Sequence, residues 1–283
     1  MGILSLLSVV IVGGAVLLGG FLQYAKLEMK NYVIDYSQTP SKVIVITGAN
    51  SGLGYYTALA LAKEKSVVIM ACRSRDRCES AKATILKEAP KATVECMDLD
   101  LASFESIRTF AKEFTSKYDH LDVLVNNAGI MALPEREVTA DGLEFQIGTN
   151  HFGHFLLTAL LFPHIATNGR IINHSSGAHL MAASNFVFKD LLSEKSYDPW
   201  IVYGNSKLAN LFFTYELNRR LTKDNNPKNI MSIAVHPGYT STNLQNSRFP
   251  FWEYLNEFAA MKGEEGALSQ IYGKFKILSY FQN

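Results

Sequence analysis

Residues 42–54 read KVIVITGANSGLG, an apolar, β-branched run that ends in three closely spaced glycines. The run predicts a buried strand, and the glycines predict a turn that leads into a helix. Similar apolar runs predict further strands at 66–71, 93–97, 122–125, 170–174 and 231–235. Helical spacing predicts helices at 55–65, 74–88, 103–117, about 142–166 and from Tyr203 onward. Apolar strands that alternate with helices form a parallel sheet covered on both faces. We therefore expect an α/β fold, a three-layer α/β/α sandwich with a mostly parallel sheet.

The composition limits the classes of protein to which the chain can belong. The 283 residues are 48% apolar, which is enough for one sizeable α/β core. The formal net charge of +1 gives no broad basic surface, so we expect no nucleic-acid partner. The three cysteines, Cys72, Cys78 and Cys96, lack metal-ligand spacing, and we expect no metal site. We expect all three to be reduced thiols on a cytosolic face rather than members of a disulfide.

The N-terminal segment differs from the rest of the chain. No charged residue occurs from Gly2 to Tyr24, and an apolar stretch of about 20 residues can cross a bilayer. We expect residues 1–30 to be a membrane anchor with its flank, inserted through residues 3–24, and residues 31–41 to be a polar linker. Lys26 and Lys30 place the remaining chain in the cytosol by the positive-inside rule. A cleaved signal and a hairpin or monolayer insertion are the alternatives. The expected location is the endoplasmic reticulum membrane, with a lipid droplet as the other candidate.

The glycine-rich turn predicts a dinucleotide site. Gly48, Gly52 and Gly54 lack a Cβ, so backbone N–H groups can approach a pyrophosphate at the positive end of the following helix. A glycine triplet alone is often only a turn, but the strand–turn–helix context favours nucleotide binding. The other residues expected to contact the nucleotide here are Thr47, Asn50, Ser51 and Leu53.

The end of the second predicted strand indicates which dinucleotide binds. An acidic residue there would bind the ribose 2′-hydroxyl of NAD, but this chain has Arg73, which can pair with a 2′-phosphate. We therefore expect NADP(H). Arg75 and Arg77 are nearby and also suit a charged helix start. Asp100 either accepts a hydrogen bond from the adenine amino group or caps the helix at 103–117.

Tyr203 and Lys207 form a candidate acid/base pair. They are four residues apart, which places them on one helix face. A tyrosine has an ordinary pKa near 10, and the lysine charge would stabilise its phenolate. Ser176 follows a predicted strand, so its hydroxyl points toward the same crevice; Ser175 is the alternative. Asn150 lies on the helix that precedes that strand.

These stretches resemble the classical short-chain dehydrogenase/reductase family, over roughly residues 41–270. The matching motifs are TGANSGLG at 47–54, NNAG at 126–129, NHFGHF at 150–155, HSS at 174–176, YGNSK at 203–207 and HPGYTST at 236–242. The local sequences ACR at 71–73, DLAS at 100–103 and SKLANLFF at 206–213 are similar to those of the retinol-dehydrogenase-like branch. The resemblance implies a single Rossmann-like domain over 42–283.

The resemblance also implies roles for individual residues. Tyr203 would be the acid/base, Ser176 would polarise the carbonyl, Lys207 would bind the nicotinamide ribose and tune Tyr203, and Asn150 would support a proton relay. Asn127, Ala128 and Gly129 would wall the adenine side, and Pro237, Gly238 and Thr242 would hold the carboxamide end.

The match to the family fades after Gly266–Ala267. Residues 276–281 are expected to form either a short terminal strand or a tail, and a missing last strand would expose a sheet edge. Five aromatic residues between 244 and 261 favour a lipophilic substrate, or else pack two helices on the core. Asn173-His174-Ser175 matches an N-glycosylation sequon. It falls on a predicted buried strand, so we do not expect glycosylation there.

The sequence thus predicts a membrane-anchored, NADP(H)-dependent oxidoreductase. It would interconvert a lipophilic aldehyde or ketone with its alcohol: a retinoid, steroid, long-chain aldehyde or polyprenoid. The alternative is a catalytically weak scaffold or isoform that lacks the C-terminal substrate region. A homodimer is left open.

Overall fold

The structure, a computed structural model, describes residues 41–183, 186, 188–238, 240 and 262–275. The expected anchor at 1–30, Thr242, the aromatic segment at 244–261 and the terminal segment at 276–281 lie outside these residues. Within the described ranges, no helix is both long and apolar enough to cross a bilayer.

A six-stranded sheet forms the middle layer, in the order β3-β2-β1-β4-β5-β6. Its strands are β1 (Val43–Thr47), β2 (Val67–Cys72), β3 (Thr93–Asp98), β4 (Leu121–Asn126), β5 (Ile165–His174) and β6 (Met231–Val235). Each neighbouring pair runs parallel. Because parallel strands are buried on both faces, the apolar runs of the sequence fall in the sheet as expected.

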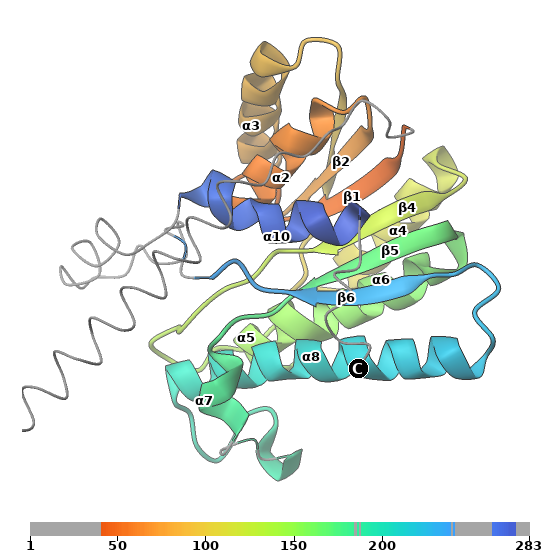
Figure 1. The fold of residues 1–283 in the computed structure, drawn as a ribbon. Helices are drawn as coiled ribbons and strands as arrows, with labels where there is room; N and C mark the ends of the chain where they lie inside the picture. The colour runs from red at the N-terminus through yellow and green to blue at the C-terminus, as the bar shows by residue number, and fades with distance from the viewer. Residues whose placement is uncertain (1–40, 184–185, 187, 239, 241–261, 276–283) are drawn as a thin grey trace, which may run out of the picture.

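Helices cover both faces of the sheet, as Figure 1 shows. One face carries α2 (Gly52–Ala62), α3 (Arg75–Glu88) and α10 (Gly263–Phe275), and the other carries α4 (Phe104–Lys117), α6 (His154–Leu161) and α8 (Pro199–Lys223). Ile46 and Ala267 belong to the apolar core on the α10 side, whereas Phe110 and Leu157 belong to the core on the α4 and α6 side. The predicted three-layer α/β/α sandwich with a parallel sheet is confirmed.

The long helix expected over about 142–166 is interrupted. It consists of α5 (Phe145–Ile147), a π-helical turn η1 (Gly148–Gly153), α6 and a 3₁₀ turn η2 (Phe162–His164). The π turn surrounds Asn150, whose carbonyl accepts from His154 Nδ1 at 2.9 Å and from Asn210 Nδ2 at 3.2 Å. Such π turns are frequent at functional sites.

Two element boundaries also differ from the sequence prediction. Helix α8 begins at Pro199 rather than at Tyr203, because Asp198 caps it by accepting from the backbone N–H groups of Trp200 and Ile201. Strand β5 begins at Ile165 rather than at residue 170, and its register shifts opposite Leu121 and Val123. The other short elements are α7 (His179–Ala183) and the 3₁₀ turn η3 (Phe188–Asp190).

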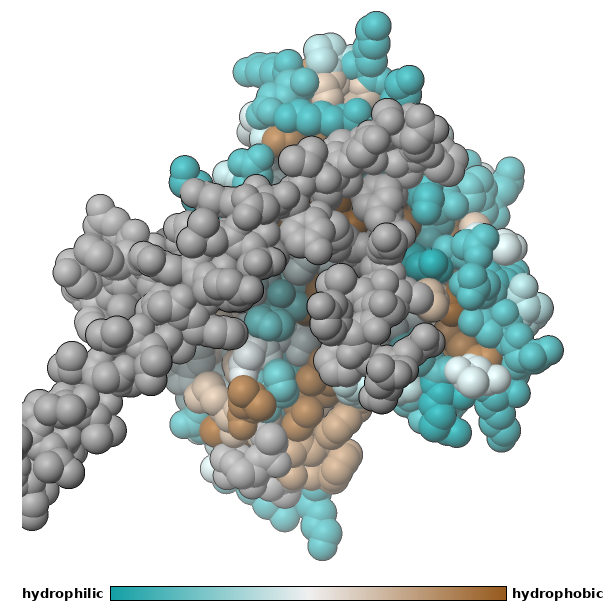
Figure 2. Space-filling model, in the orientation of Figure 1, coloured by the Kyte–Doolittle hydropathy of each residue, from teal (hydrophilic) through white to brown (hydrophobic). Residues whose placement is uncertain are grey.

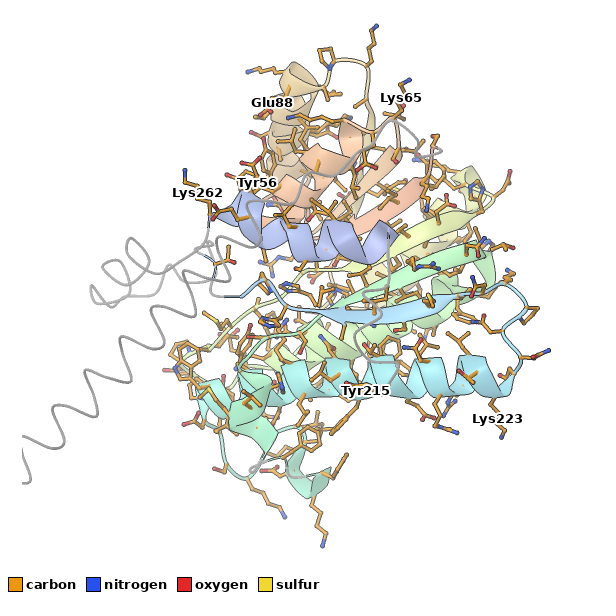
Figure 3. All side chains as sticks on the ribbon, in the orientation of Figure 1. Tyr56, Lys65, Glu88, Tyr215, Lys223 and Lys262 are labelled. Atoms are coloured by element: carbon orange, nitrogen blue, oxygen red, sulfur yellow. A yellow bond between two sulfur atoms is a disulfide. The ribbon has the colours of Figure 1, made fainter. Side chains whose placement is uncertain are left out.

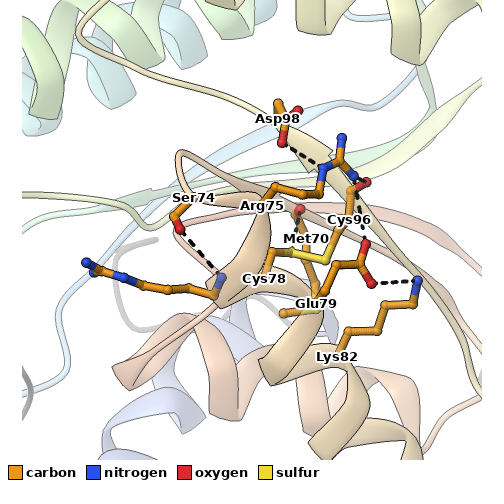
Figure 4. The surroundings of a disulfide bond; sticks show 9 residues. Met70, Ser74, Arg75, Cys78, Glu79, Lys82, Cys96 and Asp98 are labelled. Atoms are coloured by element: carbon orange, nitrogen blue, oxygen red, sulfur yellow. Dashed lines mark hydrogen bonds and ion pairs between the residues drawn. A yellow bond between two sulfur atoms is a disulfide. The ribbon is translucent and has the colours of Figure 1, made fainter.

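The expectation of three reduced cysteines is wrong in this structure. Cys78 on α3 and Cys96 on β3 form a disulfide, with their Cα atoms 6.0 Å apart, and Cys72 is a free, buried thiol (Figure 4). The sequence spacing of 18 residues does not reveal this pairing. The pairing follows from the packing of α3 on the sheet, which buries both side chains against each other.

Candidate active site

A cavity of about 400 Å³ opens at the carboxyl ends of the strands. This is where open α/β sheets bind ligands. Ten residues predicted to bind the cofactor line it: Gly48, Asn50, Ser51, Gly52, Leu53, Arg73, Asp100, Asn127, Ala128 and Gly129. The turns after β1, β2, β3 and β4 therefore meet in one elongated site.

The glycine-rich turn fits a bound pyrophosphate. Gly48 has a φ of +66°, and a Cβ there would lie 3.0 Å from the Cβ of Ala128. A Cβ on Gly54 would lie 2.5 Å from the Gly48 carbonyl oxygen and 2.6 Å from Asn127 Nδ2. Both positions need glycine for the backbone to fold this closely. The turn leads into α2, whose N-terminal N–H groups favour an anion.

The arginines after β2 have different surroundings. Arg75 forms an ion pair with Asp98 at 2.9 Å and donates to the Cys96 carbonyl, so its side chain follows β3 (Figure 4). Arg73 and Arg77 both line the cavity. Neither forms an ion pair with another described residue. Two guanidinium groups are thus placed where the adenosine end of a dinucleotide would lie.

Asp100 lines the cavity and does not cap α4. Its Oδ1 accepts from Ala102 N at 2.9 Å, within its own turn. The cap of α4 is Ser103, whose hydroxyl accepts from Ser106 N. The alternative role of Asp100 as the helix cap is therefore wrong, and its proposed contact with adenine remains a prediction.

Thr47 organises the cavity floor from beneath. Its hydroxyl accepts from the N–H groups of Asn127 and Ala128, each at 2.9 Å, and lies 2.9 Å from His154 Nε2. Burial lowers the pKa of His154 to about 3, so the ring is neutral. Because a carbonyl only accepts, Nδ1 carries the proton donated to Asn150 O, and Nε2 accepts from Thr47. Thr47 thus joins the ends of β1 and β4 and is not part of the cavity lining.

The structure separates the roles of the two serines. Ser175 is buried and donates to the Lys207 carbonyl at 2.9 Å, which ties β5 to α8. Ser176 is half-buried, accepts from Ala178 N at 3.2 Å and lies close enough to Tyr203 to affect the pKa of its hydroxyl. Burial raises the pKa of Tyr203 above 10, and the nearby Ser176 hydroxyl offsets part of this rise. Ser176 and Tyr203 are therefore adjacent polar groups, whereas Ser175 serves the packing.

Lys207 lies below Tyr203 on the same face of α8. Its Nζ is 5.6 Å from the centre of the Tyr203 ring and donates to the His174 carbonyl at 3.2 Å. A Cβ on Gly129 would lie 3.4 Å from this Nζ, so the ammonium borders the floor of the cavity. Burial lowers the pKa of Lys207 to about 8. The expected lowering of the Tyr203 pKa by this charge is not found: burial raises that pKa, and the lowering contribution comes from Ser176.

Asn150 connects the cavity wall to α8. Its Oδ1 accepts from Ile130 N, and its Nδ2 donates to Ile130 O and to Ser206 Oγ, each at 2.9 Å. The side chain is fully buried. It holds the turn after Gly129 against the helix that carries Tyr203 and Lys207.

The remaining predicted residues lie at the edge of this arrangement. Pro237 and Gly238 follow β6, where Thr240 donates to the Pro237 carbonyl at 2.8 Å.

Sequence reasoning did not assign several cavity residues: Ala71, Ser74, Leu99, Leu101, Ile130, Thr149 and His174. Ala71 and His174 end predicted strands, and Ser74, Leu99, Leu101 and Ile130 lie within five residues after one, so closeness to a strand end is the signal that could have found them.

Comparison with known proteins agrees with this geometry. Residues 42–188 match the family model for short chain dehydrogenases, and the chain belongs to that family of oxidoreductases, which act on alcohol and carbonyl groups. Within it, the chain is similar to the retinol dehydrogenases. Retinol dehydrogenase 11 of Homo sapiens is 40% identical over 254 residues, covering 88% of this chain and 78% of that protein.

Two solved structures show the shared fold. The crystal structure of an uncharacterized protein from Mycobacterium Paratuberculosis is 39% identical, has a TM-score of 0.69, and matches over 87% of this chain and 82% of that chain. A short-chain dehydrogenase from Sphingobium yanoikuyae in complex with NADPH has a TM-score of 0.62 at 22% identity, over 82% and 84% of the two chains.

Proposed function

We propose that this protein is a membrane-anchored, NADP(H)-dependent oxidoreductase that interconverts a lipophilic aldehyde or ketone with its alcohol. The observation that carries this proposal is a cavity lined by the glycine-rich turn, bordered at Gly129 and His174 by Lys207, with Tyr203 and Ser176 next to that lysine. Residues 1–30 would anchor one catalytic domain at 42–283.

The nicotinamide supplies or accepts the hydride when it is bound. Ser176 orients the carbonyl oxygen, and Tyr203 donates a proton to that oxygen. Because burial raises the pKa of Tyr203, the phenol keeps its proton at neutral pH, which suits carbonyl reduction. Lys207 borders both the cavity and the Tyr203 ring, where it can bind the nicotinamide ribose. Asn150 holds these groups in register through Ile130 and Ser206.

The preference for NADP(H) rests on the end of β2. Arg73 directly follows the strand and lines the cavity, and the chain has no acidic residue at that position. A guanidinium forms charge-assisted hydrogen bonds with a phosphate, whereas a ribose hydroxyl favours a carboxylate. NADPH in the Sphingobium yanoikuyae relative is compatible with this preference.

A lipophilic substrate is supported by the surface around α7 and α8. Apolar side chains gather there (Figure 2). Leu180 on α7 is 70% exposed, Phe188 on η3 is 74% exposed and Phe212 on α8 is 47% exposed. The curated relatives named retinol dehydrogenases point to the same substrate class.

Two features give opposite indications of whether the domain lies in the cytosol or in an oxidising compartment. Lys26 and Lys30 favour the cytosol, and with it the endoplasmic reticulum membrane. The Cys78–Cys96 disulfide favours an oxidising compartment. We retain the cytosolic orientation as the proposal, because the packing of α3 on β3 brings the two cysteines together in either redox state, and closing the bond also requires an oxidant.

The test is cofactor oxidation by the full-length protein in membranes. The panel contains a retinal, a long-chain aldehyde, a steroid ketone and a polyprenal, each with NADPH and with NADH. We expect carbonyl-dependent oxidation of NADPH that is lost in Tyr203→Phe. NADPH binding without turnover of any carbonyl would instead favour the catalytically weak scaffold.

A further inference from the structure

Helix α10 carries a polar side chain, Gln270, on the face that packs against the sheet. Gln270 is 1% exposed and lies between Ala267 and Ile271, which belong to the apolar core with Ile46 and Ile172. Figure 1 shows α10 lying along α2 on this face of the sheet. A buried amide destabilises a fold unless it is hydrogen-bonded, so an apolar residue would serve simple packing better.

Gln270 links two parts of the cofactor cavity that are distant in sequence. Its Nε2 donates to Asn127 Oδ1 at 2.7 Å, and its Oε1 accepts from the Thr57 hydroxyl at 3.0 Å. Thr57 is on α2, the helix that begins in the glycine-rich turn, and Asn127 follows β4 in the cavity wall. Gln270 therefore bridges the helix and the wall from outside the cavity.

The direction of each hydrogen bond is fixed. Asn127 Nδ2 must donate at 2.8 Å to the Thr47 carbonyl, which can only accept. Asn127 Oδ1 therefore faces Gln270, whose Nε2 must donate to it. Gln270 Oε1 then faces Thr57 as an acceptor. A carboxylate at position 270 would satisfy Thr57 but would place an acceptor against Asn127 Oδ1.

The Asn127 amide in turn supports the glycine-rich turn. A Cβ on Gly54 would lie 2.6 Å from Asn127 Nδ2, and one on Gly48 would lie 3.5 Å from it. The amide is thus packed directly beneath the part of the turn that would face the pyrophosphate. Its orientation depends on Thr47 on one side and on Gln270 on the other.

We propose that Gln270 is a positioning residue that orients Asn127 and thereby sets the affinity of the cavity for the dinucleotide. The proposal rests on the proposed nicotinamide site. It concerns the turn under the pyrophosphate, which NADP(H) and NAD(H) share. It therefore holds for either cofactor and does not involve Tyr203.

The test compares four variants of the full-length protein in detergent micelles. Gln270→Met keeps the shape and removes both bonds, and Gln270→Glu keeps only the bond from Thr57. Thr57→Val removes that bond and leaves the one to Asn127. Ser269→Ala is the control, because among the described residues the Ser269 hydroxyl bonds only the Gly266 carbonyl, within α10 itself.

The readouts are calorimetric Kd values for NADPH and NADH, the cofactor KM, and kcat at saturating cofactor. We expect Gln270→Met and Gln270→Glu to raise Kd and KM for both cofactors by about tenfold, with kcat unchanged. Thr57→Val should have a smaller effect, and Ser269→Ala none. Unchanged Kd values would overturn the proposal. A parallel loss of kcat and thermal stability would also overturn it, because Gln270 would then serve only the fold.

A cofactor-free measurement separates this inference from the proposed function. Amide hydrogen exchange at Asn127 and Ala128 should be faster in Gln270→Met than in Ser269→Ala, since their N–H groups bond to Thr47 in the same network. Equal exchange rates would refute the positioning role. A wild-type protein that binds neither cofactor would instead refute the proposed function.

Discussion

Lys207 should make the stability of the cofactor-free protein rise at alkaline pH. Its side chain is 3% exposed, and burial lowers its pKa from 10.5 to about 8. Between these two values the unfolded state binds more protons than the folded state, so the free energy of unfolding increases with pH. From about pH 7 to about pH 9.5, one such group contributes about 2 kcal/mol. The contribution is lost as the pH falls through the folded-state value.

The assay is urea unfolding of the wild type and Lys207→Met across this pH range. Methionine fills much of the space without a titrating group, so the pH dependence of the difference isolates Lys207. We expect the wild type to gain about 2 kcal/mol on the variant between about pH 7 and about pH 9.5. Lys223→Met, at the exposed end of α8 (Figure 3), is the matched control for loss of a lysine from this helix. A flat or falling difference for Lys207 would refute the buried-lysine argument.

Four further predictions concern the site and the topology. Tyr203→Phe should lower carbonyl-dependent turnover by about 10²–10⁴-fold and leave NADPH affinity nearly unchanged, because it removes only the proton donor; a variant that keeps half the rate would exclude Tyr203. Arg73→Asp should move the ratio of kcat/KM values from NADP(H) toward NAD(H), and an unmoved ratio would mean that another residue binds the phosphate. Deleting residues 1–30 should release the protein from carbonate-washed membranes, and protease should digest the domain in sealed microsomes, whereas a protected domain would place it in the lumen. Alkylation of the unfolded, unreduced protein should label one cysteine of three, and labelling of Cys78 and Cys96 would contradict the disulfide.

The amino-acid pattern alone predicts six strands, the glycine-rich turn and Tyr203 with Lys207 as a candidate acid/base pair. These features depend on local order: β1 is an apolar run followed by glycines, and Tyr203 and Lys207 share a helix face because they are four residues apart. The order of the motifs along the chain then identified the family, which the match over residues 42–188 confirmed. The position of Arg73 after β2 likewise followed from a strand end that the sequence made visible.

The packed fold was needed to show which serine lies beside Tyr203, which cysteines pair, and where the helix around Asn150 is interrupted. Ser175 and Ser176 are neighbours with the same chemistry, and the contact of Ser175 with Lys207 O distinguishes them. The same holds for Gln270, which bonds Asn127 across 143 residues of sequence. No local pattern encodes such a contact, because it exists only when β4, α2 and α10 pack together and bring the buried Gln270 amide against the half-buried Asn127 amide.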